Sequence, residues 1–170
     1  MNNPIILLTD FGLHDGYVGV LKGVIAKLNP GAHVIDLCHF IEPQNIRHGR
    51  TILLDNFEYF PDNSVFCCVI DPGVGSNRKP LVIQYQNKLF IGPDNGLLSE
   101  FFSNENIWEL PVSKNTSNTF HGRDIFAPWA AKLASNRSLL KQFRTLSIND
   151  IESSLFCDVE INDQWQNIDI

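Results

Sequence analysis

Three mainly apolar runs, separated by two stretches with helical patterning, constrain the fold more than any other feature of this sequence. The runs cover residues 5–8, 34–38 and 64–70, and Asp36 interrupts the second. Between the first two, apolar residues of segment 15–28 recur at near-helical spacing. Between the last two, Asn45 can cap a second helix that ends before Pro61. A strand-helix-strand-helix-strand order predicts a three-layer α/β/α sandwich with a mainly parallel sheet covered on both faces.

Shorter elements are expected after the third run. We expect a hairpin of segments 80–85 and 88–91, joined at Gln86-Asn87. Segment 92–96 is expected to be a turn that opens a short helix. Segment 107–110 is a further strand candidate, and another helix is expected from near Asp124. Because the chain becomes mostly polar after Asn136, we expect an α/β domain over residues 1–137 and a linker with the start of something else over 138–170.

Composition narrows the class of protein and its partners. Of 170 residues, 44% are hydrophobic and 19% charged, as in a packed globular protein. A net charge of −6 with only 13 scattered Lys and Arg residues argues against nucleic-acid binding and favours a neutral or cationic small molecule. The sequence contains neither a recognisable leader nor an apolar run of membrane-spanning length, so we expect no membrane contact and a cytoplasmic location.

The spacing and position of the cysteines predict that their thiols are buried and reduced. There are four, with no CxxC spacing, and Cys67 and Cys68 are adjacent within the third apolar run, which predicts that they face opposite sides of one strand. A zinc site would need convergent Cys and His spacing that this chain lacks, so we expect no metal.

Asp10 is the first candidate site residue. It directly follows the first apolar run and a threonine, and ligands of open α/β sheets bind outside the carboxyl ends of the strands. A carboxylate there can accept both hydroxyls of a ribose. The alternative is that Asp10 is a helix cap or a turn acid.

Asp71, Arg78 and His121 are the other candidates. Asp71 opens a loop with two glycines that contains neither a P-loop nor a dinucleotide-binding motif, and His121 lies just before the last expected helix. Together they make chemical sense as a water-activating set in which Arg stabilises developing hydroxide, His accepts a proton and Asp orients both. Alternatively, Asp71 and Arg78 form a structural ion pair, and His121 is a capping or solvated residue.

Several collinear motifs resemble one family, the S-adenosylmethionine (SAM) hydroxide adenosyltransferases, or adenosine-forming SAM hydrolases, which are related to the SAM-dependent fluorinase and chlorinase. The motifs are ILLTDFG at 6–12 with Asp15, Tyr17 and KGVI at 22–25, DPGVG at 71–75 with Arg78, GPDNG at 92–96, and TFHGRDIFAP at 119–128.

This resemblance implies an amino-terminal α/β domain, trimeric assembly, and cleavage of SAM to adenosine and L-methionine by attack of water at ribose C5′. SAM would be the substrate, with no cofactor. Asp10 would hold the ribose hydroxyls, and Phe11 and Asn95 would also contact the substrate. Asp71, Arg78 and His121 would bind and activate the water.

Two departures from the family pattern add alternatives. Gln44 stands where the family usually has an acidic residue. Family members also continue into a second, β-rich domain that helps to hold adenine and the methionine end, whereas segment 138–170 resembles at most a linker and a stub of that domain. We therefore expect this chain alone to bind SAM weakly or not at all. The alternatives are a non-catalytic adenosine-binding or assembly protein, and a SAM-dependent halide adenosyltransferase.

Overall fold

The computed structural model describes residues 3–103, 106–114 and 116–151. Its strands are β1 (Ile5–Thr9), β2 (Val34–Cys38), β3 (Val65–Val69), β4 (Pro80–Tyr85), β5 (Lys88–Pro93), β6 (Ile107–Glu109) and β7 (Arg144–Leu146). Its α-helices are α1 (Tyr17–Leu28), α2 (Ile46–Asn56) and α3 (Ala127–Ser135). A π-helical turn (Gly122–Phe126) leads into α3, and short 3-10 turns cover Phe57–Tyr59, Ser99–Phe101, Arg137–Gln142 and Ile148–Asp150.

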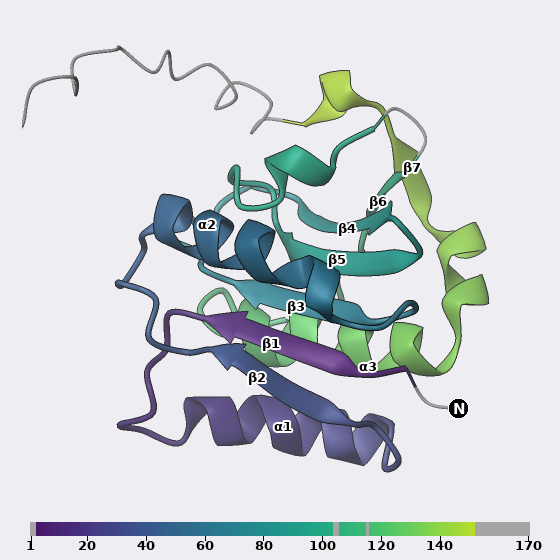
Figure 1. The fold of residues 1–170 in the computed structure, drawn as a ribbon. Helices are drawn as coiled ribbons and strands as arrows, with labels where there is room; N and C mark the ends of the chain where they lie inside the picture. Colours follow the sequence, from purple (N-terminus) through teal and green to yellow (C-terminus); the bar gives the residue numbers. More distant parts are fainter. Residues whose placement is uncertain (1–2, 104–105, 115, 152–170) are drawn as a thin grey trace, which may run out of the picture.

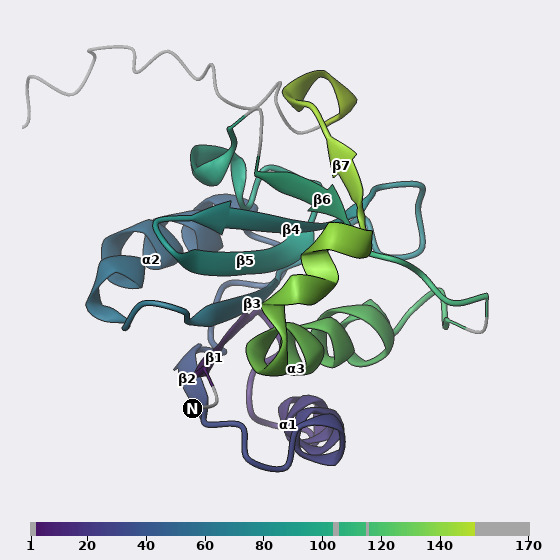
Figure 2. The same ribbon diagram turned by 90° about the vertical axis from the view of Figure 1, so that its right-hand side faces the viewer.

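The strands form one seven-stranded sheet in the order β2-β1-β3-β5-β4-β6-β7. Helices α1 and α3 cover one face of the sheet and α2 covers the other (Figures 1 and 2). The predicted α/β class is therefore confirmed. Within the described residues, no helix is long and apolar enough to cross a membrane.

The expectation of a mainly parallel sheet was wrong. β2, β1, β3 and β5 are parallel to one another, but β4 pairs antiparallel with β5 and with β6, and β6 pairs antiparallel with β7. The cause is the hairpin at Gln86-Asn87, where both residues adopt positive φ (43° and 61°) and reverse the chain after two residues. Every strand added beyond β5 runs antiparallel to its neighbours, so the sheet is mixed.

The inner parallel strands β1 and β3 are buried on both faces, which explains their continuous apolar sequence, whereas the edge strand β2 is only partly buried. All five residues of β1 and of β3 are buried, and alternate residues enter two different cores. Cys67 packs in the core beneath α1 and α3, and Cys68 in the core beneath α2, as the sequence predicted. Burial raises the pKa of the Cys67 thiol to about 12, so this thiol stays protonated and unreactive. Cys157 lies outside the described residues.

The segment after Asn136 contributes to the same sheet as far as the structure describes it. Strand β7 pairs with β6 through Leu146 opposite Ile107, and Leu146 is buried in the core beneath α2. The assignment of 138–170 to a linker and the beginning of a second domain stays a prediction, and residues 152–170 lie outside the described part.

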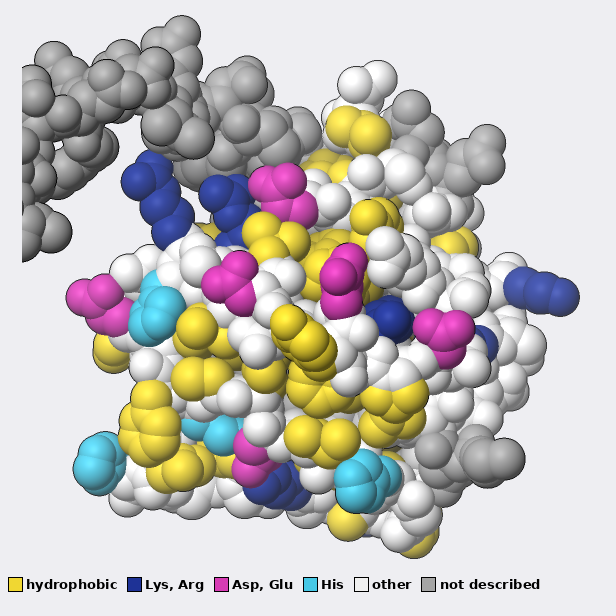
Figure 3. Space-filling model, viewed as in Figure 1, with side chains coloured by type: hydrophobic (Ala, Val, Ile, Leu, Met, Phe, Trp, Pro, Cys, Tyr) yellow, Lys and Arg dark blue, Asp and Glu magenta, His cyan; other side chains and the backbone are white. Residues whose placement is uncertain are grey.

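The face that carries α2 exposes several large apolar side chains between its acidic ones (Figure 3). Among the large apolar side chains of all described residues, Tyr59 at 85% and Phe40 at 63% are the most exposed.

Gly92 lies at a tight contact between β5 and the backbone of β3. A Cβ at this position would lie 2.7 Å from the carbonyl oxygen of Cys68, a backbone atom that cannot move aside. We therefore expect Gly92→Ala to lower the free energy of unfolding by about 1–3 kcal/mol, measured by urea denaturation. Gly19→Ala is the matched control, because a Cβ there meets nothing within 4 Å, and alanine should stabilise helix α1 by about 0.5–1 kcal/mol. Equal changes in the two variants would contradict the packing argument.

Candidate active site

The carboxyl ends of β1, β3 and β5 bring three of the predicted residues to one edge of the sheet. Asp10 directly follows β1, while Asp71 and Asn95 each stand two residues beyond the ends of β3 and β5. Because these neighbouring strands are parallel, the loops that follow them leave the sheet on the same side. The sequence placed these residues after strands, and the parallel pairing makes them neighbours.

Arg78 joins Asp71 to His121. Its Nε donates to Oδ1 and Oδ2 of Asp71 at 2.9 and 3.0 Å, and its Nη2 also donates to Oδ2. The same Nη2 lies 2.6 Å from Nδ1 of His121. The side chains of Arg78 and Asp71 are each only 5% exposed, so this fork-shaped pairing is largely shielded from water. The three residues that the sequence grouped by chemistry are therefore in direct contact.

The contact with Arg78 fixes the tautomer of His121. A guanidinium has only donors, so Nδ1 of His121 must be the acceptor, and the neutral ring then carries its hydrogen on Nε2. Burial, followed by the positive charge of Arg78, holds the pKa of His121 below its ordinary value, although Asp71 and Asp124 act in the opposite direction. His121 is therefore neutral at physiological pH, with a donor on Nε2.

The backbone around His121 is a π-helical turn, a feature often found at functional sites. His121 immediately precedes this turn, and Gly122 packs so closely that a Cβ there would lie 3.1 Å from the Tyr17 hydroxyl. The glycine thus lets the histidine approach the aromatic residues of the β1–α1 connection. Phe11 and Tyr17 contact each other there with ring centroids 4.6 Å apart.

The lowered pKa of His121 gives a testable pH dependence. In the folded protein we expect its NMR titration midpoint to lie below the ordinary value of 6.5. Since the unfolded chain then binds the proton more readily, this group makes the folded state lose stability as pH falls below the unfolded pKa, and the loss is complete below the folded pKa. A midpoint at or above 6.5 would contradict the proposed control by burial and Arg78.

Asp10, at the same edge of the sheet, is held by the backbone of Gln44. Its Oδ2 accepts the backbone N–H of Gln44 at 2.7 Å, and Oδ1 has no hydrogen-bond partner among the described residues. Asp10 does not cap the following helix, because the N-cap of α1 is Gly16, and Asp15 instead accepts the N–H of Tyr17 at 2.9 Å. The remaining oxygen of Asp10 is available to a ligand.

A cavity of about 150 Å³ lies between these groups. It is lined by Asp10, Phe11, Tyr17, Gln44, Val69, Asp71, Val74, Thr119, His121 and Gly122. Four of the six predicted site residues thus share one space: Asp10, Phe11, Asp71 and His121. Sequence reasoning missed Gln44 and Thr119 as lining residues, although Gln44 had been singled out as unusual and Thr119 lies inside a family motif.

Arg78 does not line this cavity. It lies behind Asp71 and His121 and lines a separate polar cavity of about 350 Å³ with Gly75, Ser76 and Lys114 among its walls. From this position Arg78 can hold Asp71 and His121 in place and set their electrostatics. Asp71 lines the smaller cavity, and His121 lines both.

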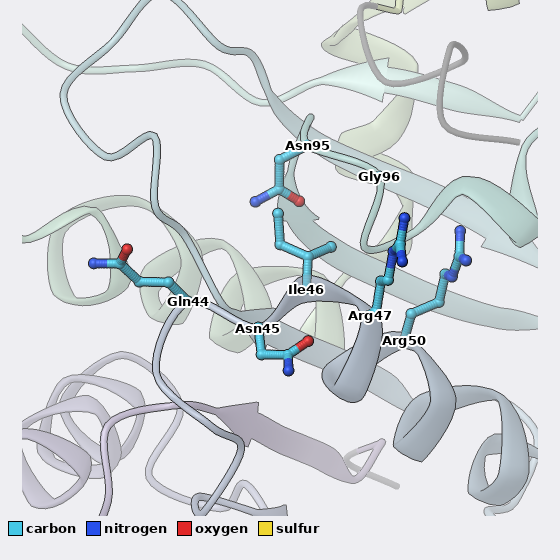
Figure 4. A pocket seen from close by; sticks show the side chains of 7 residues that line it. All are labelled: Gln44, Asn45, Ile46, Arg47, Arg50, Asn95 and Gly96. Atoms are coloured by element: carbon cyan, nitrogen blue, oxygen red, sulfur yellow. The ribbon is translucent and has the colours of Figure 1, made fainter. Parts of the chain in front are cut away.

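Asn95 lines a third cavity, of about 390 Å³, at the amino-terminal end of α2. Figure 4 shows its side chain above Ile46, with Arg47 and Arg50 extending side by side from α2. The Asn95 amide is engaged within the protein, because Nδ2 donates to the carbonyl of Ile70 at 2.8 Å and Oδ1 accepts from Leu97 N at 3.2 Å. Asn95 therefore ties the β5 loop to the start of the Asp71 loop. Gln44 lines both this cavity and the one beside Asp10.

The charges around the smaller cavity favour a cation. Arg78 balances Asp71, and with a neutral His121 the carboxylate of Asp10 remains as the net charge on the wall. Among the described residues, no three His, Cys, Asp or Glu side chains are grouped as metal ligands would be.

Comparisons with known proteins agree on one family. The family model described as "SAM hydroxide adenosyltransferase N-terminal domain" matches residues 5–143. The (R)-S-adenosyl-L-methionine hydrolase of Methanocaldococcus jannaschii is 43% identical over 141 residues, which covers 78% of this chain and 53% of that protein. The fluorinase of Actinopolyspora mzabensis is more distant, at 26% identity over 88% of this chain and 60% of that enzyme.

A solved structure supports the fold. The crystal structure of an uncharacterized conserved protein from Thermotoga maritima superposes with a TM-score of 0.73 at 44% identity, covering 78% of this chain and 54% of that one. The chain spans about half the length of the curated hydrolases that it matches. From the family model and these identities, the chain belongs to the SAM hydroxide adenosyltransferase family, in which it corresponds to the amino-terminal domain.

Proposed function

We propose that this chain provides the water-activating half of a SAM hydrolase, which cleaves SAM to adenosine and L-methionine without a cofactor. The observation that carries the proposal is the cavity in which Asp71 and His121, bridged from behind by Arg78, face the available carboxylate oxygen of Asp10. The names of the relatives, (R)-S-adenosyl-L-methionine hydrolase, support the same reaction.

In the proposed reaction, the oxygen of one water molecule forms a bond to ribose C5′ while the C5′–S bond breaks. The bonding electrons pass to sulfur, which changes from a sulfonium cation to the neutral thioether of methionine. Since this leaving group needs no protonation, the protein has to hold the water in line and accept one proton. Asp10 would accept hydrogen bonds from the ribose hydroxyls, and its negative charge would favour the cationic substrate.

The hydrogen-bond pattern supports a division of labour that differs from the one suggested by sequence. Nδ1 of His121 already accepts from Arg78, so taking a proton there would break that 2.6 Å contact. Oδ1 of Asp71 accepts only one hydrogen bond from Arg78 and keeps a lone pair, whereas Oδ2 accepts two, and Asp71 lines the cavity. We therefore assign proton acceptance to Asp71 and assign to the Nε2–H of His121 a hydrogen bond to the developing hydroxide.

The size of the cavity supports a shared substrate site. Pockets for ligands of this kind usually measure about 300–1,000 Å³, whereas the cavity between Asp10 and His121 measures about 150 Å³. It can hold the reacting end of SAM, and the neighbouring cavity beyond Gln44 offers further space. The matched part of this chain covers only 52% and 53% of two of the matched hydrolases. We propose that the rest of the substrate is held by protein outside residues 3–151, in a homo-oligomer such as the trimer implied by the resemblance.

Incubation of the chain in H₂¹⁸O with SAM, at a concentration high enough to offset the weak binding expected of this chain alone, tests the proposal. We expect adenosine carrying one heavy oxygen together with unlabelled methionine, and a loss of at least about 100-fold in His121→Ala, which lacks the hydroxide donor. His33→Ala, an exposed histidine at the start of β2, is the matched control. A 5′-halo product that depends on chloride or fluoride would instead identify a halide adenosyltransferase. Adenosine binding without turnover would identify a non-catalytic member of the family.

A further inference from the structure

A chain of polar contacts that the proposed mechanism does not use runs behind Asp10. Lys22 Nζ of α1 lies 2.6 Å from Oδ2 of Asp36 in β2, and Oδ1 of Asp36 lies 3.1 Å from Nε2 of His39. Nδ1 of His39 lies 2.7 Å from the hydroxyl of Thr9, the last residue of β1. Lys22 and Asp36 are about 40% exposed at their side chains, but His39 is 3% exposed and Thr9 fully buried. This series of contacts from Lys22 to Thr9 thus links the surface to the residue next to Asp10.

The donors and acceptors in this series of contacts can be assigned in one consistent order. The Asp36 carboxylate can only accept, so the hydrogen of a neutral His39 belongs on Nε2, which faces it. The 3.1 Å between Nε2 and Oδ1 of Asp36 is an electrostatic contact, because the two groups lack the alignment of a hydrogen bond. Nδ1 is then an acceptor, and the Thr9 hydroxyl donates to it. Although partial burial acts in the opposite direction, the hydrogen bond from Lys22 and the close contact with His39 hold the pKa of Asp36 below its ordinary value, so Asp36 stays charged.

His39 also fixes the backbone on the far side of Asp10. Its carbonyl accepts the N–H of Gly12 at 2.7 Å, and the Thr9 hydroxyl that it orients accepts the N–H of Phe11 at 3.4 Å. Asp10 lies between these anchored residues, and its own carboxylate accepts the N–H of Gln44, five residues beyond His39. The β2–α2 connection therefore holds the Asp10 loop at both the backbone and the side chain.

We infer that His39 is a positioning residue for Asp10, acting through Thr9 and held in place by Asp36 and Lys22. Its buried ring sets the direction in which the available carboxylate oxygen of Asp10 points into the cavity. This inference deepens the proposed function, because it rests on Asp10 as the anchor of the ribose hydroxyls.

Calorimetry with two ligands separates positioning from general stability. The ratio of the dissociation constants of 2′,3′-dideoxyadenosine and adenosine measures what the ribose hydroxyls contribute. We expect Asp10→Asn to lower this ratio by about tenfold or more, as for loss of a hydrogen bond to a charged group, and His39→Leu to lower it by a similar factor. His39→Asn, which keeps an acceptor near the place of Nδ1, should retain most of it, and His33→Leu should leave it unchanged. Equal weakening of both ligands in His39→Leu would overturn the inference.

Amide hydrogen exchange provides a readout that needs no ligand. In the free chain, the Gln44 N–H is held by Asp10, so we expect its hydrogen exchange to accelerate by about tenfold in His39→Leu. The acceleration should be smaller in Asp36→Asn. Because Asp36 is exposed, this second variant keeps the test available if His39→Leu does not fold. If the unmodified chain does not distinguish the two nucleosides, the ribose-binding role of Asp10 fails. Gln44 exchange still decides the role of His39, and unchanged exchange in both variants would refute it.

Discussion

Replacing Arg78 with leucine is expected to lower the free energy of unfolding by about 3–5 kcal/mol, because it leaves a buried carboxylate without its partner. Asp71 is 5% exposed at its side chain and receives its charged hydrogen bonds from Arg78. Domains of this kind are stable by only about 5–15 kcal/mol, so the change should be plain in urea or thermal denaturation.

A double variant tests the physical reason for this loss. Asp71→Asn combined with Arg78→Leu removes both charges, and it should recover much of the stability lost in Arg78→Leu alone. Arg144→Leu is the matched control, since Arg144 pairs with Glu109 at the surface, where its side chain is 66% exposed, and such a pair contributes only about 0–1 kcal/mol. A cost for Arg78→Leu as small as that for Arg144→Leu would show that Asp71 is not held by this pair. If Arg78→Leu does not fold, Arg78→Lys should show a smaller loss in the same direction.

Asp71→Asn should reduce the release of adenosine from SAM by about 100- to 10,000-fold, the usual contribution of a positioned proton acceptor. An amide of nearly the same shape cannot take the proton of the attacking water, although it can still contact Arg78 and fill its place in the cavity wall. Initial rates of adenosine formation at saturating SAM measure the effect, which should fall mainly on kcat.

The control for this variant is Asp55→Asn, which makes the same chemical change on the exposed face of α2. It should leave the rate unchanged. A rate for Asp71→Asn within threefold of the unmodified chain would remove Asp71 from the mechanism. An increase in KM with an unchanged kcat would instead indicate that Asp71 binds substrate without acting on water.

The competing interpretation of Asp71 and Arg78 as a structural ion pair describes part of what the two residues do. Because the pair is buried, removing one partner alone is expected to destabilise the fold. The pair differs from an ordinary structural bridge because Arg78 also contacts His121 and because Asp71 and His121 both line the cavity that contains Asp10. Stability and the proposed chemistry are therefore expected to depend on the same guanidinium.

Local patterns were sufficient to predict the elements that carry the site. The apolar run that became β1 is buried on both faces, Asn45 caps α2 by accepting the N–H of His48 at 2.9 Å, and Gln86-Asn87 forms the expected tight turn. The short helix expected after Gly96 is only a 3-10 turn at Ser99–Phe101. These features depend on neighbours a few residues away, and that is why a single sequence contains the information.

The sequence by itself determined the α/β class, the position of Asp10 and Asp71 after buried strands, and the chemical types that could act together. Only the tertiary structure decided that β6 and β7 extend the sheet antiparallel, that Arg78 lies behind the cavity, and that His39 is buried beside Thr9. The physical reason is distance along the chain. Burial patterns and turn residues are set locally, whereas the contact of Arg78 with His121 joins residues 43 positions apart and exists only once the sheet and α3 have packed.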